Sequence, residues 1–99
     1  MADLSITVEQ VGAPLGSLTL AAAAKEIAAT LTNRANAVIE LAAFDGTGTP
    51  VDFQWSTASA GTYARAMAGT LRLPVVNGQS WYVKEGATAA ATLQVRCAG

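Results

Sequence analysis

The sequence predicts an all-β protein, a small antiparallel β-sandwich or barrel of about seven to eight short strands. Apolar and polar residues alternate with period two in one segment after another, as they do in half-buried strands. Glycine, proline and asparagine separate these segments at the short intervals typical of sandwiches and small barrels. The 99 residues are enough for one domain with a single core, so we expect one β domain over residues 1–99.

The first expected strand covers residues 4–9, where Leu4, Ile6 and Val8 alternate with polar residues. Glycine and proline between residues 12 and 16 then indicate a loop, and residues 17–20 offer a short second strand. Two interpretations of this part of the chain stay open. Residues 1–16 form an N-terminal arm that pairs with or lies on a partner, or the strand is an internal strand of the sandwich.

Residues 17–33, SLTLAAAAKEIAATLTN, are ambiguous between helix and strand. A helix is favoured by a heptad seam that continues beyond this segment, with apolar residues at most of its positions. Its members are Leu20, Ala24, Ile27, Leu31, Arg34, Val38 and Leu41. A strand is favoured because the seam contains an arginine, because threonine and asparagine are poor helix formers, and because no capping box precedes the segment. We expect a strand over residues 26–32 in preference to a helix, and a short helical turn near residues 21–25 stays open beside that strand.

The later strands are expected where alternating apolar residues lie between turn residues. Their ranges are 37–44, 51–55, 70–73, 80–84 and 91–97. Pro74 should lie at a strand end or on an edge strand, because it cannot donate a ladder hydrogen bond. Asn77 and Gly78 should form a turn, since both residues tolerate positive φ.

Aromatic residues are few, and their spacing divides them between core and surface. Phe53 and Trp55 share a strand face, which favours the core. Trp81 and Tyr82 are adjacent in one expected strand, so one should be buried and the other exposed. Together with residues of the possible arm, these two supply the candidate partner contacts. The candidates are Asp3, Leu4, Ile6, Val8, Trp81 and Tyr82.

Enzymatic activity is not expected from this composition, and neither is a metal site or a cofactor. The chain has no histidine, which removes the commonest general base and metal ligand, and its single cysteine, Cys97, can form neither an intrachain disulfide nor a zinc cluster. Asp45 and Asp52 flank a glycine-rich loop, but the ligand spacing of a calcium loop is missing. The glycines of that loop match neither a dinucleotide fingerprint nor a phosphate loop.

The charges argue against nucleic acid and against a membrane. Six lysines and arginines are scattered among seven acids, whereas a nucleic-acid site needs them clustered. The longest apolar stretch, residues 18–24, is far shorter than the roughly 20 residues of a membrane span. The first ten residues do not resemble a signal peptide, so we expect synthesis and folding in a cytoplasm.

Charged residues make up only 13% of the chain, about half the usual share of roughly 25%. A surface of small polar residues lacks the charge repulsion that keeps copies of a protein apart. Two interpretations follow: much of the surface is buried against a partner or against copies of the chain, or the protein is an ordinary neutral β domain.

Two stretches resemble small head proteins of tailed bacteriophages. MADLSITVEQV is an acidic start that runs directly into an alternating strand, and GQSWYVKEGATAAATLQVRC is similar to their closing hairpin. The resemblance covers about half of the chain. It implies a capsid decoration (cement) protein, which binds the outside of an assembled head, contacts the major capsid protein and stabilises the shell, commonly as a homo-oligomer, with a trimer favoured. The expected location is the capsid surface of the virion.

Two other functions stay open beside decoration. The same composition describes a tail- or fibre-associated module that binds a receptor or glycan through exposed aromatic residues. The heptad would instead support a helical cytoplasmic partner protein.

Overall fold

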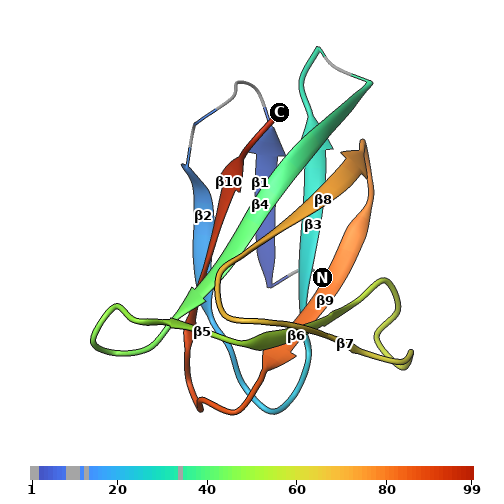
Figure 1. Ribbon diagram of the computed structural model, residues 1–99. Coiled ribbons are helices and arrows are strands. Elements are labelled where there is room, and N and C mark those ends of the chain that lie inside the picture. The colour runs from blue at the N-terminus through green and yellow to red at the C-terminus, as the bar shows by residue number, and fades with distance from the viewer. Residues whose placement is uncertain (1–2, 9–11, 13, 34) are drawn as a thin grey trace.

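The computed structural model describes residues 3–8, 12, 14–33 and 35–99. It is all-β, with ten strands in two sheets and no helix in the part of the chain that it describes (Figure 1). Sheet A consists, in spatial order, of β1 (Leu4–Val8), β3 (Lys25–Leu31), β9 (Ser80–Glu85), β6 (Phe53–Ser56) and β7 (Ala64–Ala66). Sheet B consists of β2 (Pro14–Thr19), β10 (Thr92–Cys97), β4 (Asn36–Phe44) and β5 (Pro50–Val51), with β8 (Thr70–Val76) also paired to β4.

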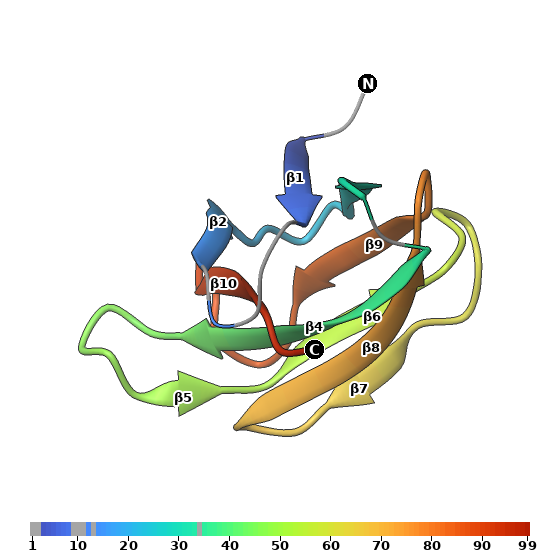
Figure 2. The ribbon, with the colours of Figure 1, turned by 90° about the horizontal axis from the view of Figure 1, so that it is seen from above.

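The two sheets form a sandwich and not a closed barrel, which confirms the predicted fold class. Every strand pair is antiparallel except β1 with β3, which is parallel. Within sheet B, β4 is the central strand and β8 runs beside it over seven residue pairs (Figure 2). β4 therefore lies between β10 and β8, two strands that are distant from it in the sequence.

The core lies between the sheets and is filled by the inward half of each alternating strand. In β4 the inward residues Ile39, Leu41 and Ala43 are fully buried, as the sequence predicted, while the alternate residues are partly exposed. Trp81 and Phe53 are the largest fully buried side chains. Burying one such aromatic side chain removes roughly 150–250 Å² from water, so these two dominate the core energetics.

The ambiguous segment is a strand with a turn before it. Ile27, Ala29 and Leu31 of β3 are buried at alternate positions, which is the period of a strand and not of a helix. The expectation of a short helical turn near residues 21–25 is wrong. Leu20 donates its backbone N–H to the Ala91 carbonyl next to the β2–β10 pairing, and the Ala21 carbonyl accepts from the Glu85 N–H of β9, so these groups pair with distant segments and not along a helix. Arg34 of the heptad lies outside the described residues.

The described residues form ten strands where seven or eight were expected, because the very short strands β5 and β7 leave little signal in the sequence. β5 is two residues long and is followed by Asp52, whose side chain accepts the Ala87 N–H and pairs with Arg65. β7 is Ala-Arg-Ala, which has no large apolar residue to mark a strand. Its register comes from pairing with β6, which local sequence does not report.

Pro74 lies inside β8, which pairs only with β4 among the described strands. Its opposite residue on β4 is Val38, whose N–H and C=O bond to the carbonyl of Gly99 and the N–H of Ala98 on the β10 side. The N–H and C=O of one strand residue point toward the same neighbouring strand. Those of Val38 point toward β10, so Val38 and Pro74 share no ladder hydrogen bonds. The proline nitrogen therefore faces the free edge of β8, where its missing donor costs the ladder nothing, and the edge-strand prediction is confirmed.

Candidate docking surface

The structure divides the six predicted contact residues between core and surface. Ile6, Val8 and Trp81 are at most 1% exposed, whereas Tyr82 is half-buried on the outer face of sheet A. This confirms that one of the two adjacent aromatic residues is core and the other reaches the surface. The buried three offer no surface to a partner in this arrangement. A contact through them stays a prediction, which requires β1 to move for Ile6 and Val8 and β9 to move for Trp81.

The two remaining candidates lie at the N-terminal end of β1. Leu4 is half-buried and packs over Gly16, where an added Cβ would come within 3.0 Å of its Cδ1. Asp3 is exposed, and its Oδ2 accepts the Glu26 N–H at 2.8 Å. Glu26 is the register partner of Tyr82, so Asp3 and Tyr82 both flank the start of β3. In the described part of the possible arm, residues 4–8 form β1, the edge strand of sheet A, and residues 14–16 begin β2, the edge strand of sheet B.

On the outer face of sheet A, the charged groups are largely paired with one another. The Lys84 Nζ lies 4.3 Å from the centre of the Tyr63 ring, and the Arg65 Nη1 lies 3.4 Å from the Asp52 Oδ2. The Tyr63 hydroxyl in turn donates to the Ser59 carbonyl. These contacts give the face two tyrosines and two cations in a mixed polar surface.

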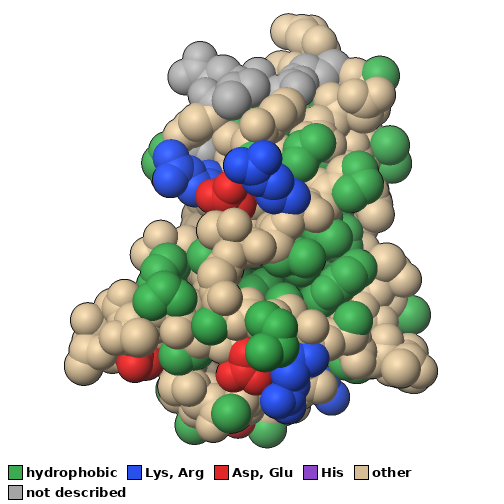
Figure 3. Space-filling view, viewed as in Figure 1, with side chains coloured by type: hydrophobic (Ala, Val, Ile, Leu, Met, Phe, Trp, Pro, Cys, Tyr) green, Lys and Arg blue, Asp and Glu red, His purple; other side chains and the backbone are tan. Residues whose placement is uncertain are grey.

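The outer face of sheet B is organised differently, as rows of residues across four strands, and we call it the sheet B face. One row is Arg96 on β10, Glu40 on β4 and Arg72 on β8, which the strand register places directly beside one another. Figure 3 shows basic side chains flanking an acidic one on this face. The next row is uncharged and runs through Ser17, Gln94, Ala42 and Thr70.

The arginines of the charged row keep most of their donors in solvent. The Arg72 Nε lies 3.3 Å from the Glu40 Oε2, with the Arg72 side chain 69% exposed and the Glu40 side chain only 19% exposed. The Arg96 Nη2 donates to the Gly12 carbonyl at 3.3 Å. A guanidinium has five N–H donors, so each arginine still offers several to a partner.

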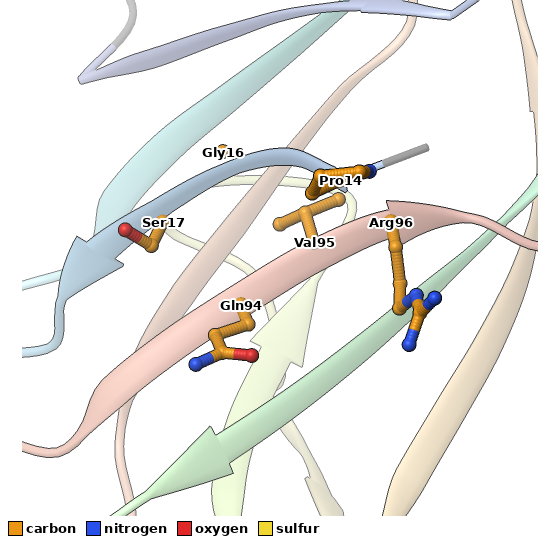
Figure 4. Close-up of a pocket in the computed structure, with 6 residues that line it drawn as sticks. All are labelled: Pro14, Gly16, Ser17, Gln94, Val95 and Arg96. Carbon is orange, nitrogen blue, oxygen red and sulfur yellow. The ribbon is translucent and has the colours of Figure 1, made fainter. Parts of the chain in front are cut away.

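A shallow hollow of about 480 Å³ lies beside Arg96, over β2 and β10. Its lining residues are Pro14, Gly16, Ser17, Gln94, Val95 and Arg96 (Figure 4). The register of β2 against β10 shifts between Val95 and Arg96, which locally disrupts the regular ladder at this edge. Val95 points into the core, so the polar groups of the hollow come from the exposed Ser17, Gln94 and Arg96.

Apolar residues lie on both sides of the charged row on the sheet B face. The outward residues Val38, Ala42 and Phe44 of β4 are half-buried, and Pro74 and Val76 of β8 are exposed, Val76 at 54%. Apolar surface next to arginine matches the general composition of protein–protein interfaces.

The described residues contain no group of three or more Asp, Glu, His or Cys side chains that could hold a metal ion. Asp45 of the glycine-rich loop closes its own turn: its Oδ1 accepts the Thr47 hydroxyl at 2.7 Å and the backbone N–H groups of Thr47 and Thr49. These hydrogen bonds, led by the Thr47 hydroxyl, lower the pKa of the Asp45 carboxyl. The carboxylate is committed to the turn. Cys97 is a core side chain on β10.

The sequence alone does not indicate the sheet B face as a site. The available signal is alternation, because Glu40, Arg72 and Arg96 each lie between apolar neighbours in their strands. The three residues become neighbours only through pairing of strands more than 20 residues apart.

Comparisons with protein-family models, with curated proteins and with solved structures found no match to this chain. Among the described residues no helix is long and apolar enough to span a bilayer.

Proposed function

We propose that this chain is a non-enzymatic structural protein that docks through the sheet B face on an assembled protein surface, the outside of a tailed-phage capsid. The single observation that carries docking is the sheet B face itself, on which apolar residues of β4 and β8 lie beside solvent-exposed arginines. The capsid as partner, and the capsid surface as location, rest on the resemblance of the two end segments to small head proteins.

The size of the face favours a repetitive partner. Four strands spaced about 4.8 Å apart and about six residues long cover roughly 400 Å². A stable interface buries about 800 Å² on each partner. One face alone would therefore bind weakly, and an oligomer that engages several equivalent sites on a lattice would bind far more tightly, because its later contacts form at high effective concentration.

Binding of this kind would stabilise the shell. A ligand that binds only the assembled, mature lattice shifts the equilibrium toward that lattice by mass action. The low charge of the whole chain, 13% of residues, agrees with a surface that is partly covered in the assembly. We propose a homo-oligomer, with a trimer as the expected form, and light scattering of the purified protein measures its mass.

The direct test is co-sedimentation of the purified chain with assembled heads of the phage that encodes it and, separately, with unassembled major capsid subunits. We expect saturable binding to heads and none to free subunits, together with a higher melting temperature of the decorated heads. Equal binding to subunits, or no binding to heads, would refute decoration.

A receptor- or glycan-binding module is the second candidate, and the outer face of sheet A favours it. Tyr82 and the Tyr63–Lys84 pair lie there, and aromatic rings can stack on sugars. Binding to a glycan array that is lost in Tyr82→Ala and retained in Arg72→Gln would support this candidate over decoration.

A further inference from the structure

We propose that the sheet B face receives an acidic segment of its partner, with two carboxylates of that segment bound to Arg96 and Arg72. This deepens the proposed function, because it rests on the sheet B face being the docking surface and adds the chemistry of the partner. The occupant is an extended stretch of protein with Asp or Glu two or three residues apart.

Charge complementarity is the first argument. The charged row contributes two arginines and one glutamate, a local balance of +1, on a chain whose net charge is −1. Its neighbours on the face are uncharged. They are Ser17, Thr19, Val38, Ala42, Phe44, Thr70, Thr92 and Gln94. Approach through this face therefore attracts an acidic surface, although the molecule as a whole repels one.

These two arginines, in addition, contribute little to the stability of the fold. The Arg72–Glu40 pair is exposed on the arginine side, and such pairs contribute little to folding because solvent screens them. Arg96 makes one hydrogen bond, to the Gly12 carbonyl, among the described residues. Arginine binds carboxylates with two parallel hydrogen bonds, so both side chains are suited to a partner's carboxylate.

The spacing sets the pattern of the partner. Arg96 and Arg72 lie on strands that flank β4, so their backbones are separated by two strand spacings, about 10 Å. Residues two or three apart in an extended chain are separated by about 7–10 Å, which matches that span. The carboxylate at Arg96 would lie beside the hollow, on the face where Gln94 is the next outward residue of β10 and Ser17 is its partner on β2.

A substitution of Glu40 should strengthen binding of an acidic segment, an effect that a purely structural role of Glu40 would not predict. Its carboxylate lies between the two arginines and competes with the partner for Arg72. Replacing it with glutamine raises the local balance from +1 to +2. We therefore expect Glu40→Gln to bind an acidic segment more tightly than the natural chain does.

The test is a titration of the isotope-labelled full chain with a blocked peptide, Thr-Glu-Thr-Glu-Thr, followed by NMR at low salt. Its twin, with both glutamates replaced by glutamine, reports contacts that do not need the carboxylates. We expect shifts centred on Arg72, Arg96, Gln94 and Ser17, at least tenfold weaker binding in Arg72→Gln/Arg96→Gln, and tighter binding in Glu40→Gln. The matched control, Arg65→Gln/Lys84→Gln, removes the same charge from sheet A and should bind like the natural chain.

Several results would overturn the proposal. They are equal binding of the glutamine twin, shifts centred on sheet A, equal losses in the control, or tighter binding of a short single-stranded DNA of equal charge. Assembled heads separate this inference from the proposed function. If heads bind the natural chain and Arg72→Gln/Arg96→Gln equally, the acidic partner is wrong and decoration stands. If heads are not bound while the acidic peptide is, decoration is wrong and the carboxylate site stands.

Discussion

Gly86, between β9 and β10, has no room for a side chain. A Cβ built there would lie 2.6 Å from the Oδ2 of Asp52, 2.7 Å from its Cγ and 2.9 Å from its backbone oxygen. Real Cβ atoms do not approach other atoms so closely, and one of the three is backbone, so a rotamer change of Asp52 cannot relieve the clash. Gly86→Ala must therefore move the strand connection or Asp52, and Asp52 also holds Arg65 and the Ala87 N–H.

We expect Gly86→Ala to lower the free energy of unfolding by about 2–3 kcal/mol, the upper part of the range for overpacking. For a domain of this size that corresponds to a fall in melting temperature of roughly 10–20 °C. Urea unfolding followed by tryptophan fluorescence measures the free energy, since Trp81 is in the core. Gly46→Ala is the matched control: it lies in an open turn with nothing within 4 Å of the added methyl, and should change stability by less than about 0.5 kcal/mol. Equal effects of the two substitutions would refute the reasoning.

Three further substitutions test other parts of the fold. Because hydrogen bonds from two threonines of its own turn lower the pKa of Asp45 in the folded state, its contribution to stability is present above the unfolded pKa of about 3.9 and is lost as pH falls through the folded value. Asp45→Ala should thus destabilise the protein at pH 7 and show a shrinking difference toward pH 2 in thermal melts; a difference independent of pH would contradict this. Pro74→Val restores an N–H to the free edge of β8, so we expect greater self-association in concentration-dependent light scattering, and an unchanged mass would show that Pro74 does not protect the edge. Ala90 has φ of 55°, a left-handed conformation that costs a non-glycine residue about 1 kcal/mol, so Ala90→Gly should raise the free energy of unfolding by up to that amount. A lower stability would show that the lost methyl or the backbone entropy of glycine outweighs the strain.

The fold class was predictable because alternation of side chains is a local signal. β4 and β10 show buried and exposed residues at strictly alternate positions over their whole length, and their ranges were predicted to within one residue. The segment with four alanines was harder, since alanine fits helix, strand and turn alike. Ile27 and Leu31 are four residues apart and would share a face in a helix as well as in a strand. The burial of Ala29 between them is what shows period two.

The docking surface was not predictable, because its neighbours are set by strand pairing. Glu40, Arg72 and Arg96 lie 24 to 56 residues apart in the chain, and a shift of the β4–β8 register by two residues would place Thr70 or Pro74 beside Glu40 instead. Local sequence also does not show which of two adjacent side chains is buried. Alternation predicts that Trp81 and Tyr82 face opposite sides of their strand, but which one lies in the core depends on where sheet B lies.

Two alanines test most directly the proposal that the chain docks through the sheet B face. Ala42 is partly exposed at the centre of that face, and Ala28 is partly exposed on the outer face of sheet A, each on a strand with neighbours on both sides. Glutamine at either position adds neutral bulk without changing charge. We predict that Ala42→Gln weakens binding to assembled heads at least tenfold while Ala28→Gln binds like the natural chain. Unchanged binding of Ala42→Gln, with both variants folded, would contradict the account.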